Sequence, residues 1–139
     1  MAKIATEFVT AAAALAPVLE LFDSLAGRPL SGVWLRHEHG CLTEAALDFG
    51  GIFLAAVAEE DFDTLKLEIS ARPSLTEFVD SNEMVPWSAY IGRQFSWGWL
   101  TMNQQGYVDG VLLGFGDDIC PKILLNVIAS EIKVGAITF

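Results

Sequence analysis

The chain has 139 residues, which is the size of one ordinary domain. Counting glycine with the apolar residues and leaving tyrosine out brings the apolar share to about 60%, against a usual ~45–50%, so an intrinsically disordered chain is excluded. Eighteen acidic residues against eight basic ones give a formal net charge of −10, which repels phosphate backbones and anionic lipids and excludes nucleic acid and membrane surfaces as expected partners.

Residues 4–26 have the spacing of an amphipathic helix. Apolar residues recur at intervals of three, four and seven, which places them on one face: Ile4, Phe8, Leu15, Leu19 and Phe22. Pro17 lacks an amide hydrogen, so we expect a break there and a better-formed helix from Pro17 to Ala26. Gly27 is expected to end this helix in the left-handed conformation.

From Leu30 onward the sequence is typical of β-strands, because apolar and polar residues alternate between turns marked by glycine. Gly40 and Gly106 end two polar hairpin tips, where a positive φ costs glycine least. Turns this short join antiparallel neighbours. The expected strands cover residues 30–38, 43–49, 52–58 and 64–70 in the first half, and 94–103, 107–115, 122–129 and 131–137 in the second.

Between these halves, residues 71–91 are expected to form a linker. Ser74 and Glu77 have the spacing of a capping box after Pro73, which predicts a short helix near 75–80. Pro86 and Trp87 then lead into the second half.

Several strands are apolar on both faces. In strand 94–103, simple alternation directs Phe95, Trp97 and Trp99 to one face and Leu100 and Met102 to the other. Such strands need cover on both sides, from the helix and from a second layer or subunit, so we expect a homodimer.

An internal repeat is the most informative feature of the sequence. Residues 27–31 (GRPLS) match residues 92–96 (GRQFS) at an offset of 65. Residues 65–67 (LKL) match residues 132–134 (IKV) at an offset of 67. At an intermediate offset of 66, four residues match four others in the same order: Gly32, Gly40, Phe49 and Gly50 match Gly98, Gly106, Phe115 and Gly116. Turns and inward-facing residues in the same order favour a duplication.

The prediction is therefore one α+β domain over residues 1–139, mainly antiparallel sheet with an internal pseudo-repeat. An N-terminal helix (1–26) packs on it, and the linker 71–91 joins the β units 27–70 and 92–139.

His37 and His39 are the first candidate site, because on a strand both side chains face one way, as a two-histidine metal site requires. The pattern H-x-H is weak support, and the corresponding tip of the second half carries Asn103, Gln104 and Gln105 instead. We therefore interpret both tips as solvated hairpin turns and expect no metal.

Two acidic clusters, residues 59–63 and 117–118, offer oxygen ligands for a divalent cation or charge for a basic partner. The spacing of a calcium-binding loop is absent. A charged turn before a strand is the commoner role for such clusters.

Trp97 and Trp99 flank a glycine and form a candidate stacking platform, although two core indoles are the commoner explanation. Asp48 and Asp109 lie on otherwise apolar strands, and burial would raise their pKa and make them candidate acids or bases. An exposed face is the more usual place for such residues. None of the common nucleophile, phosphate-binding, dinucleotide or zinc motifs occurs, so we assign no catalytic residue and expect no cofactor.

Two cysteines, Cys41 and Cys120, are too few for a disulfide scaffold and lack C-x-x-C spacing. The apolar stretch of residues 8–22 is too short and too polar to span a membrane, and Glu7 interrupts what would be a secretory signal. We therefore expect a cytoplasmic protein that does not enter the membrane.

The segment from Trp97-Gly98-Trp99 through Asn103, Gly106, Tyr107 and Asp109 resembles a family of small bacterial proteins of unknown function with the pattern W-x-W…N-x-x-G-Y-x-D. The resemblance covers most of residues 27–137 and implies a β-rich fold without an assigned catalytic residue. The chain is also similar in style to immunity proteins of bacterial toxin systems. The resemblance leaves the function open. The candidate binding residues are Asn103, Gln104, Tyr107, Asp109, Trp97 and Trp99.

Three functions follow as hypotheses. The first is a non-enzymatic binding or inhibitory module, immunity-like, whose acidic surface faces a basic protein. The second is a small-molecule or metal-assisted enzyme that uses His37, His39, Asp109 or Asp48. The third is a structural subunit of a homo-oligomer, which the apolar excess would suit.

Overall fold

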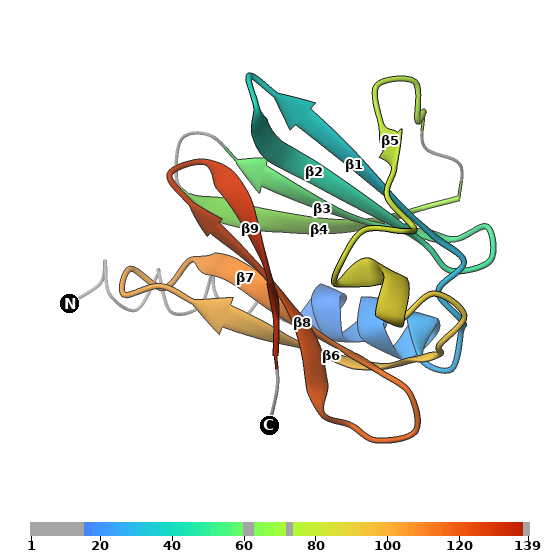
Figure 1. Ribbon diagram of the computed structural model, residues 1–139. Coiled ribbons are helices and arrows are strands. Elements are labelled where there is room, and N and C mark those ends of the chain that lie inside the picture. Colours follow the sequence, from blue (N-terminus) through green and yellow to red (C-terminus); the bar gives the residue numbers. More distant parts are fainter. Residues whose placement is uncertain (1–15, 60–62, 72–73, 138–139) are drawn as a thin grey trace.

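The computed structural model describes residues 16–59, 63–71 and 74–137. These residues form two antiparallel sheets that lie face to face, with a helix beside them (Figure 1). The α+β class and the predominance of antiparallel sheet are confirmed.

The first sheet has the strand order β4-β3-β2-β1-β5 and the second has the order β6-β7-β8-β9. The strands of the first sheet are β1 (Gly32–Glu38), β2 (Cys41–Asp48), β3 (Phe53–Glu59), β4 (Thr64–Ser70) and β5 (Val79–Asp80). Those of the second sheet are β6 (Phe95–Met102), β7 (Val108–Phe115), β8 (Pro121–Ile128) and β9 (Glu131–Ala136). Each of the eight expected strands is present within two residues of its predicted ends.

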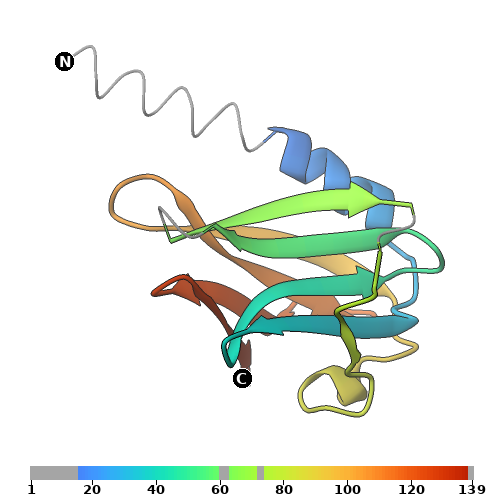
Figure 2. The same cartoon turned by 90° about the horizontal axis from the view of Figure 1, so that it is seen from above.

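The core lies between the two sheets and is closed at one side by the helix. Strand β2 packs against β9, and β4 packs against β7 (Figure 2). Alternate residues of these strands point inward, as the two-residue period of a strand requires, and leucines such as Leu47, Leu54, Leu113 and Leu125 are almost completely buried.

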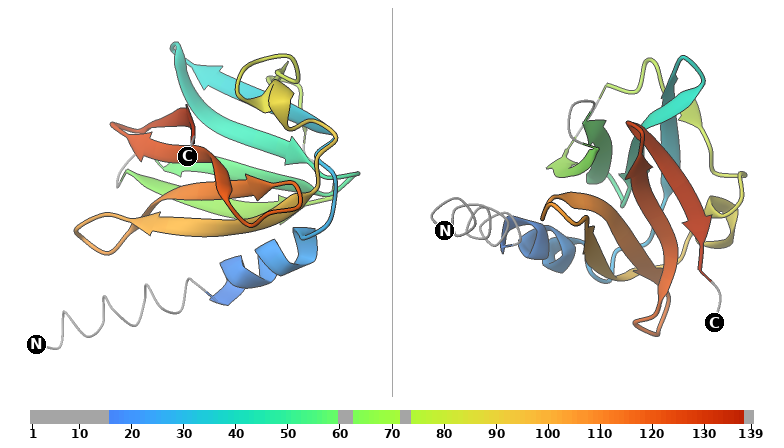
Figure 3. Two further views of the ribbon diagram at one scale, coloured as in Figure 1. Left: turned by 60° about the horizontal axis from the view of Figure 1, so that its bottom comes forward. Right: turned by 90° about the vertical axis from the view of Figure 1, so that its left-hand side faces the viewer.

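Residues 16–25 are helical, so the predicted helix is confirmed for its described part, and the part before residue 16 lies outside the described residues. Gly27 follows at φ +84°, the left-handed conformation expected after a helix. The helix lies along β6 (Figure 3) and buries Phe22 and Leu25 completely. Gly98 makes this approach possible, because a Cβ at that position would lie 2.6 Å from the Phe22 ring.

The expected orientation of β6 is wrong in one respect. The register of β6 against β7 shifts between Phe95 and Trp97, so Ser96 is a bulge. Phe95 consequently points into the core and packs against Phe49, with ring centroids 5.6 Å apart, whereas Trp97 and Trp99 face outward. Simple alternation had placed all three aromatic residues on one face.

The helix expected near 75–80 is absent. The amide of Phe78 donates to the carbonyl of Leu75 in a turn, and β5 follows directly and pairs with β1. The hydroxyl of Ser74 contacts that of Thr76, 3.1 Å away, instead of capping a helix. The short helix of the linker is a 3-10 turn, η1 (Trp87–Ala89), and Trp87 anchors it in the core.

Two contacts join the two β units. Around an isolated bridge between Pro29 and Gln94, the segments 27–30 and 92–95 exchange four backbone hydrogen bonds of 2.7–2.9 Å. At another place, the Asp63 carboxylate of the β3–β4 turn accepts a 2.7 Å hydrogen bond from the amide of Ser130 in the β8–β9 turn.

Candidate functional site

Three of the eight large apolar side chains that the described residues expose lie on the loop of residues 77–85, which projects at the edge of the first sheet (Figure 2). Val79, Met84 and Val85 are 61%, 50% and 84% exposed. A folded monomer rarely leaves such a group uncovered unless it contacts a partner.

The 77–85 loop is held firmly although its tip is exposed. Ser81 is buried; its amide donates to the Val33 carbonyl at 2.8 Å and its hydroxyl donates to the Val79 carbonyl at 3.0 Å. The Asn82 side chain accepts a 2.7 Å hydrogen bond from the Val33 amide. These contacts fix the loop backbone before any partner arrives, so little ordering entropy would be lost on binding.

The charge on this loop is uniformly negative. Glu77, Asp80 and Glu83 are exposed between the apolar side chains. No lysine or arginine occurs between residues 73 and 92. The loop therefore interleaves exposed apolar side chains with carboxylates, the two kinds of group that the centre and the rim of protein interfaces combine.

The loop was not among the candidate sites predicted from the sequence. Its sequence nevertheless indicates an exposed interaction surface, because large apolar residues alternate with carboxylates in a stretch without basic residues. The capping-box spacing of Ser74 and Glu77 predicted a helix near residues 75–80 instead, and a helix would have buried one face of this segment.

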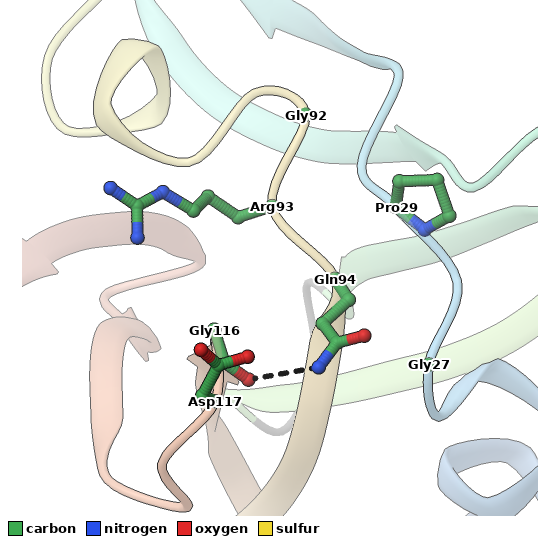
Figure 4. A pocket seen from close by; sticks show the side chains of 7 residues that line it. All are labelled: Gly27, Pro29, Gly92, Arg93, Gln94, Gly116 and Asp117. Carbon is green, nitrogen blue, oxygen red and sulfur yellow. Dashed lines mark hydrogen bonds between the residues drawn. The ribbon is translucent and has the colours of Figure 1, made fainter.

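A second candidate is a pair of adjoining hollows that share Arg93, Gly116 and Asp117 (Figure 4). Their volumes are about 440 and 580 Å³. Gly27, Gly92 and Gln94 line the first hollow, and Tyr90 and Lys122 line the second.

A third hollow of about 500 Å³ lies at the β6–β7 hairpin tip and is lined by Met102, Gln105 and three of the predicted binding residues, Asn103, Gln104 and Asp109. Asn103 is occupied in the turn, since its side-chain oxygen accepts hydrogen bonds from the amides of Gln105 and Tyr107 at 2.9 and 3.1 Å. The hydroxyl of Thr101 donates to the Asp109 carboxylate at 2.7 Å.

The two tryptophans lie on the outer face of the second sheet, apart from that tip. Trp97 is half-buried and packs edge-on against Phe22, with ring centroids 5.9 Å apart. Trp99 is half-buried. It pairs with Leu112 of β7, which pairs with Leu124 of β8, which in turn pairs with Gly135 of β9. The contact of Trp97 with the helix is a structural role, and Trp99 faces the outside of the sandwich.

The remaining candidates have structural contacts. His37 and His39 are exposed at the β1–β2 turn, and within the described residues no group of three His, Cys, Asp or Glu side chains could hold a metal. The Asp48 carboxylate accepts a 2.8 Å hydrogen bond from the amide of Gly51 in the turn that follows. Both Asp48 and Asp109 are half-buried.

The acidic clusters are dispersed by the fold. Asp118 contacts Lys122 at 3.4 Å and the Cys120 amide at 3.3 Å. Asp63 holds the Ser130 turn, and residues 60–62 of that cluster lie outside the described residues.

One carboxyl has a clearly shifted pKa. Burial raises the pKa of Glu44, the Arg36 guanidinium 4.0 Å away lowers it, and the carboxylates of Glu68 and Glu38 raise it again. Glu44 lies on the outer face of the first sheet rather than in a hollow, and Arg36 is engaged with Glu38 as well.

In the part of the chain that the structure describes, no helix has both the length and the apolar character needed to cross a bilayer.

Comparison with known proteins identifies a family. No curated protein and no solved structure matches the chain. A family model described as a family of unknown function (DUF6334) matches residues 16–138, which is most of the chain. The protein therefore belongs to the DUF6334 family of proteins of unknown function.

Proposed function

We propose that the protein is a non-enzymatic binding module that captures a basic protein through the 77–85 loop. The single observation that carries this proposal is the rigidly held display of Val79, Met84 and Val85 among carboxylates. Buried apolar side chains would supply affinity, and the carboxylates would attract and orient a positively charged partner.

The distribution of charge supports a basic partner. Among the described basic residues, Arg36, Lys66, Lys122 and Lys133 each lie within 4.0 Å of a carboxylate. Glu77 and Glu83 have no such neighbour in the described part of the chain and lie on the loop itself. Arg36 lies 6.0 Å from the Phe78 ring of the loop but is paired with Glu38, so the loop keeps an excess of negative charge.

The test uses the immobilised full chain and a variant in which Val79, Met84 and Val85 are replaced by serine. We expect the wild-type chain to retain basic proteins from a lysate of its host and the triple variant to lose them. A retained protein is then purified, and its affinity for both chains is measured by calorimetry. We expect a loss of about tenfold or more, the effect of removing one or two interface anchors.

The matched control replaces Ile119 and Ile128 by serine. These residues are also exposed but lie elsewhere, Ile119 in the β7–β8 turn and Ile128 at the end of β8. This control is expected to bind like the wild type. Capture of acidic proteins, or equal affinity for the wild type and the triple variant, contradicts the proposal.

We further propose that the module is inhibitory, in the manner of an immunity protein, and acts in the cytoplasm as a homodimer. Two free cysteines, Cys41 and Cys120, are consistent with a reducing compartment. Inhibition would be tested by the activity of the purified partner with and without the chain, and the homodimer by light scattering.

We also propose that the two halves arose by duplication. The strand order supports this, because β1 to β4 and β6 to β9 are each four consecutive antiparallel strands. Packing supports it as well, since β2 against β9 is the counterpart of β7 against β4. Pro29 pairs with Gln94, its own counterpart at an offset of 65, as expected at a twofold axis.

Cross-strand pairing extends the correspondence. Trp34 pairs with Ala46 as Trp99 pairs with Leu112, so the offset of 65 continues along β1 and β6. Gly98 then corresponds to Val33, and the sequence match of Gly32 with Gly98 is incidental. The same offset relates the buried Phe22 of the helix to the buried Trp87 of η1.

A further inference from the structure

We infer that the hollows around Arg93 form a binding site for a small zwitterion, a free α-amino acid with an apolar side chain. The site comprises Arg93, Asp117, Tyr90, Phe115 and Gly116, and it is distinct from the 77–85 loop. Its existence does not depend on the proposed protein partner.

Arg93 is the centre of the site because its charge is uncompensated. Among the described residues, the guanidinium of Arg93 has no carboxylate within 4.0 Å and no hydrogen-bond acceptor. It lines both hollows and lies on the same side of the 92–94 segment as the Asp117 carboxylate (Figure 4). A guanidinium without a partner can donate two parallel hydrogen bonds to the two oxygens of a carboxylate.

Under the proposed duplication, Arg28 is the counterpart of Arg93. At the corresponding position of the first half, the Nε of Arg28 donates a 3.1 Å hydrogen bond to the Ser24 carbonyl at the end of the helix. In the second half the helix is reduced to the single turn η1, and Ala89, at the position of Ser24, lines the hollow beside Arg93. The same residue type is thus structural in one half and available in the other.

The remaining charges favour a zwitterion over a simple anion. Lys122 lies 3.4 Å from Asp118 and neutralises it, which leaves Asp117 as the acidic group facing Arg93 across the hollow. No ion pair joins Arg93 to Asp117 in the described residues. A ligand that carries a carboxylate for Arg93 and an ammonium for Asp117 satisfies both, whereas an anion alone would be repelled by Asp117.

The walls indicate an apolar side chain. Tyr90 is half-buried and stacks on Phe115, with ring centroids 5.3 Å apart and an interplanar angle of 22°. Phe115 is 2% exposed and belongs to the core, so the Tyr90 ring is the aromatic surface that the larger hollow offers to a ligand. Gly92 and Gly116, both at positive φ, leave open space where other residues would place a Cβ. The hollow of about 580 Å³ has room for an amino acid and is open to solvent, so part of the ligand would stay exposed.

The test is a titration of the isotope-labelled full chain with leucine, followed by the amide signals of residues 92–94 and 116–118 in NMR spectra. We expect saturable shifts at these amides with a dissociation constant in the millimolar range or below. N-acetyl-leucine, which keeps only the carboxylate, and leucinamide, which keeps only the ammonium, are expected to bind about tenfold or more weakly.

Arg93→Gln and Asp117→Asn are expected to weaken leucine binding by about tenfold or more each. Lys66→Gln, which removes an exposed cation on the outer face of β4, is the matched control and should leave binding unchanged. Thermal melts of all variants check that each variant is folded. No unfolding is expected, because the replaced side chains are exposed.

Three results would overturn the inference. They are the absence of saturable shifts up to about 10 mM leucine, equal binding by leucine and N-acetyl-leucine, and unchanged binding by both site variants. None of these results bears on the binding of a basic protein by the 77–85 loop, so the two proposals fail separately.

Discussion

Two glycines that lie 65 residues apart have the same backbone conformation. Gly27 and Gly92 have φ values of +84° and +85°, and an added Cβ would meet no atom within 4 Å at either position. Replacement of either by alanine therefore costs only backbone strain, about 1–2 kcal/mol in the free energy of unfolding. Urea denaturation of the two single variants should give equal losses, and a cost at one position without the other would contradict the proposed duplication.

Glu44 predicts a pH dependence of stability. Because burial raises its pKa in the folded state, Glu44 favours folding fully below the ordinary value of 4.5, and this contribution is lost as the pH rises through the raised pKa. Glu44→Gln has no carboxyl group to ionise at this position, so its stability does not fall for this reason as the pH rises. Its stability relative to the wild type should therefore be greater at about pH 7 than at about pH 3.5, as measured by denaturant midpoints. A difference of the opposite sign would show that the attraction of Arg36 outweighs burial.

Among the elements, the helix depends on one close contact with β6. Gly98→Ala would place a methyl group 2.6 Å from the Phe22 ring, so the ring must move. We expect a loss of about 1–3 kcal/mol, typical of overpacking. Phe22→Leu should cost less in the Gly98→Ala chain than in the wild type, and a double-mutant cycle by urea denaturation measures this coupling. Simple additivity of the two changes would mean that the helix does not close on β6.

The turn η1 depends on Trp87 in the way that the helix depends on Phe22. Trp87 is 1% exposed, so its replacement by alanine should cost about 3–5 kcal/mol. Ser88→Ala, at the exposed neighbouring residue, is the control and should stay within about 0.5 kcal/mol of the wild type in the same denaturation assay. If Trp87→Ala is nearly neutral, the linker is not anchored in the core.

An element could be predicted from the sequence where neighbouring residues determine it, and could not where contacts with distant parts of the chain determine it. The eight main strands were predictable because alternation and glycine turns are local signals. The bulge at Ser96 was not, because it arises from the fit of β6 to β7, and it reverses the face of Phe95. The segment 75–80 forms a turn and β5 instead of a helix because β1 offers it backbone partners, and because Phe78 packs 6.0 Å from the Arg36 guanidinium. Such partners are invisible in a local capping pattern.

The candidate sites were less predictable for the same reason. Of the six candidate binding residues, Asn103, Gln104 and Asp109 line one hollow, whereas Tyr107, Trp97 and Trp99 do not line it. The Arg93 site combines residues from the linker, β7 and the β7–β8 turn, so only the three-dimensional structure brings them together. Nothing in the spacing of Tyr90, Arg93 and Asp117 indicates that they share a hollow.

For the whole molecule, the net charge of −10 makes capture of a basic partner sensitive to salt. The Debye length falls to about 10 Å at 0.1 M salt, so added salt should slow association through the acidic rim while dissociation, governed by the apolar contacts, changes little. Stopped-flow or surface-based kinetics with the captured partner would show this pattern. An association rate independent of salt would mean that the carboxylates of the loop do not take part.

The exchange of hydrogen bonds between segments 27–30 and 92–95 has a consequence for synthesis of the chain on the ribosome. The opposite layer of β1 to β4 is complete only when β7 and β9, which pack on β4 and β2, have left the exit tunnel, and until then the leucine-rich inner faces stay exposed to other nascent chains. A pause in translation between the two halves should therefore lower the yield of native protein, whereas a pause before β1 has been made should not.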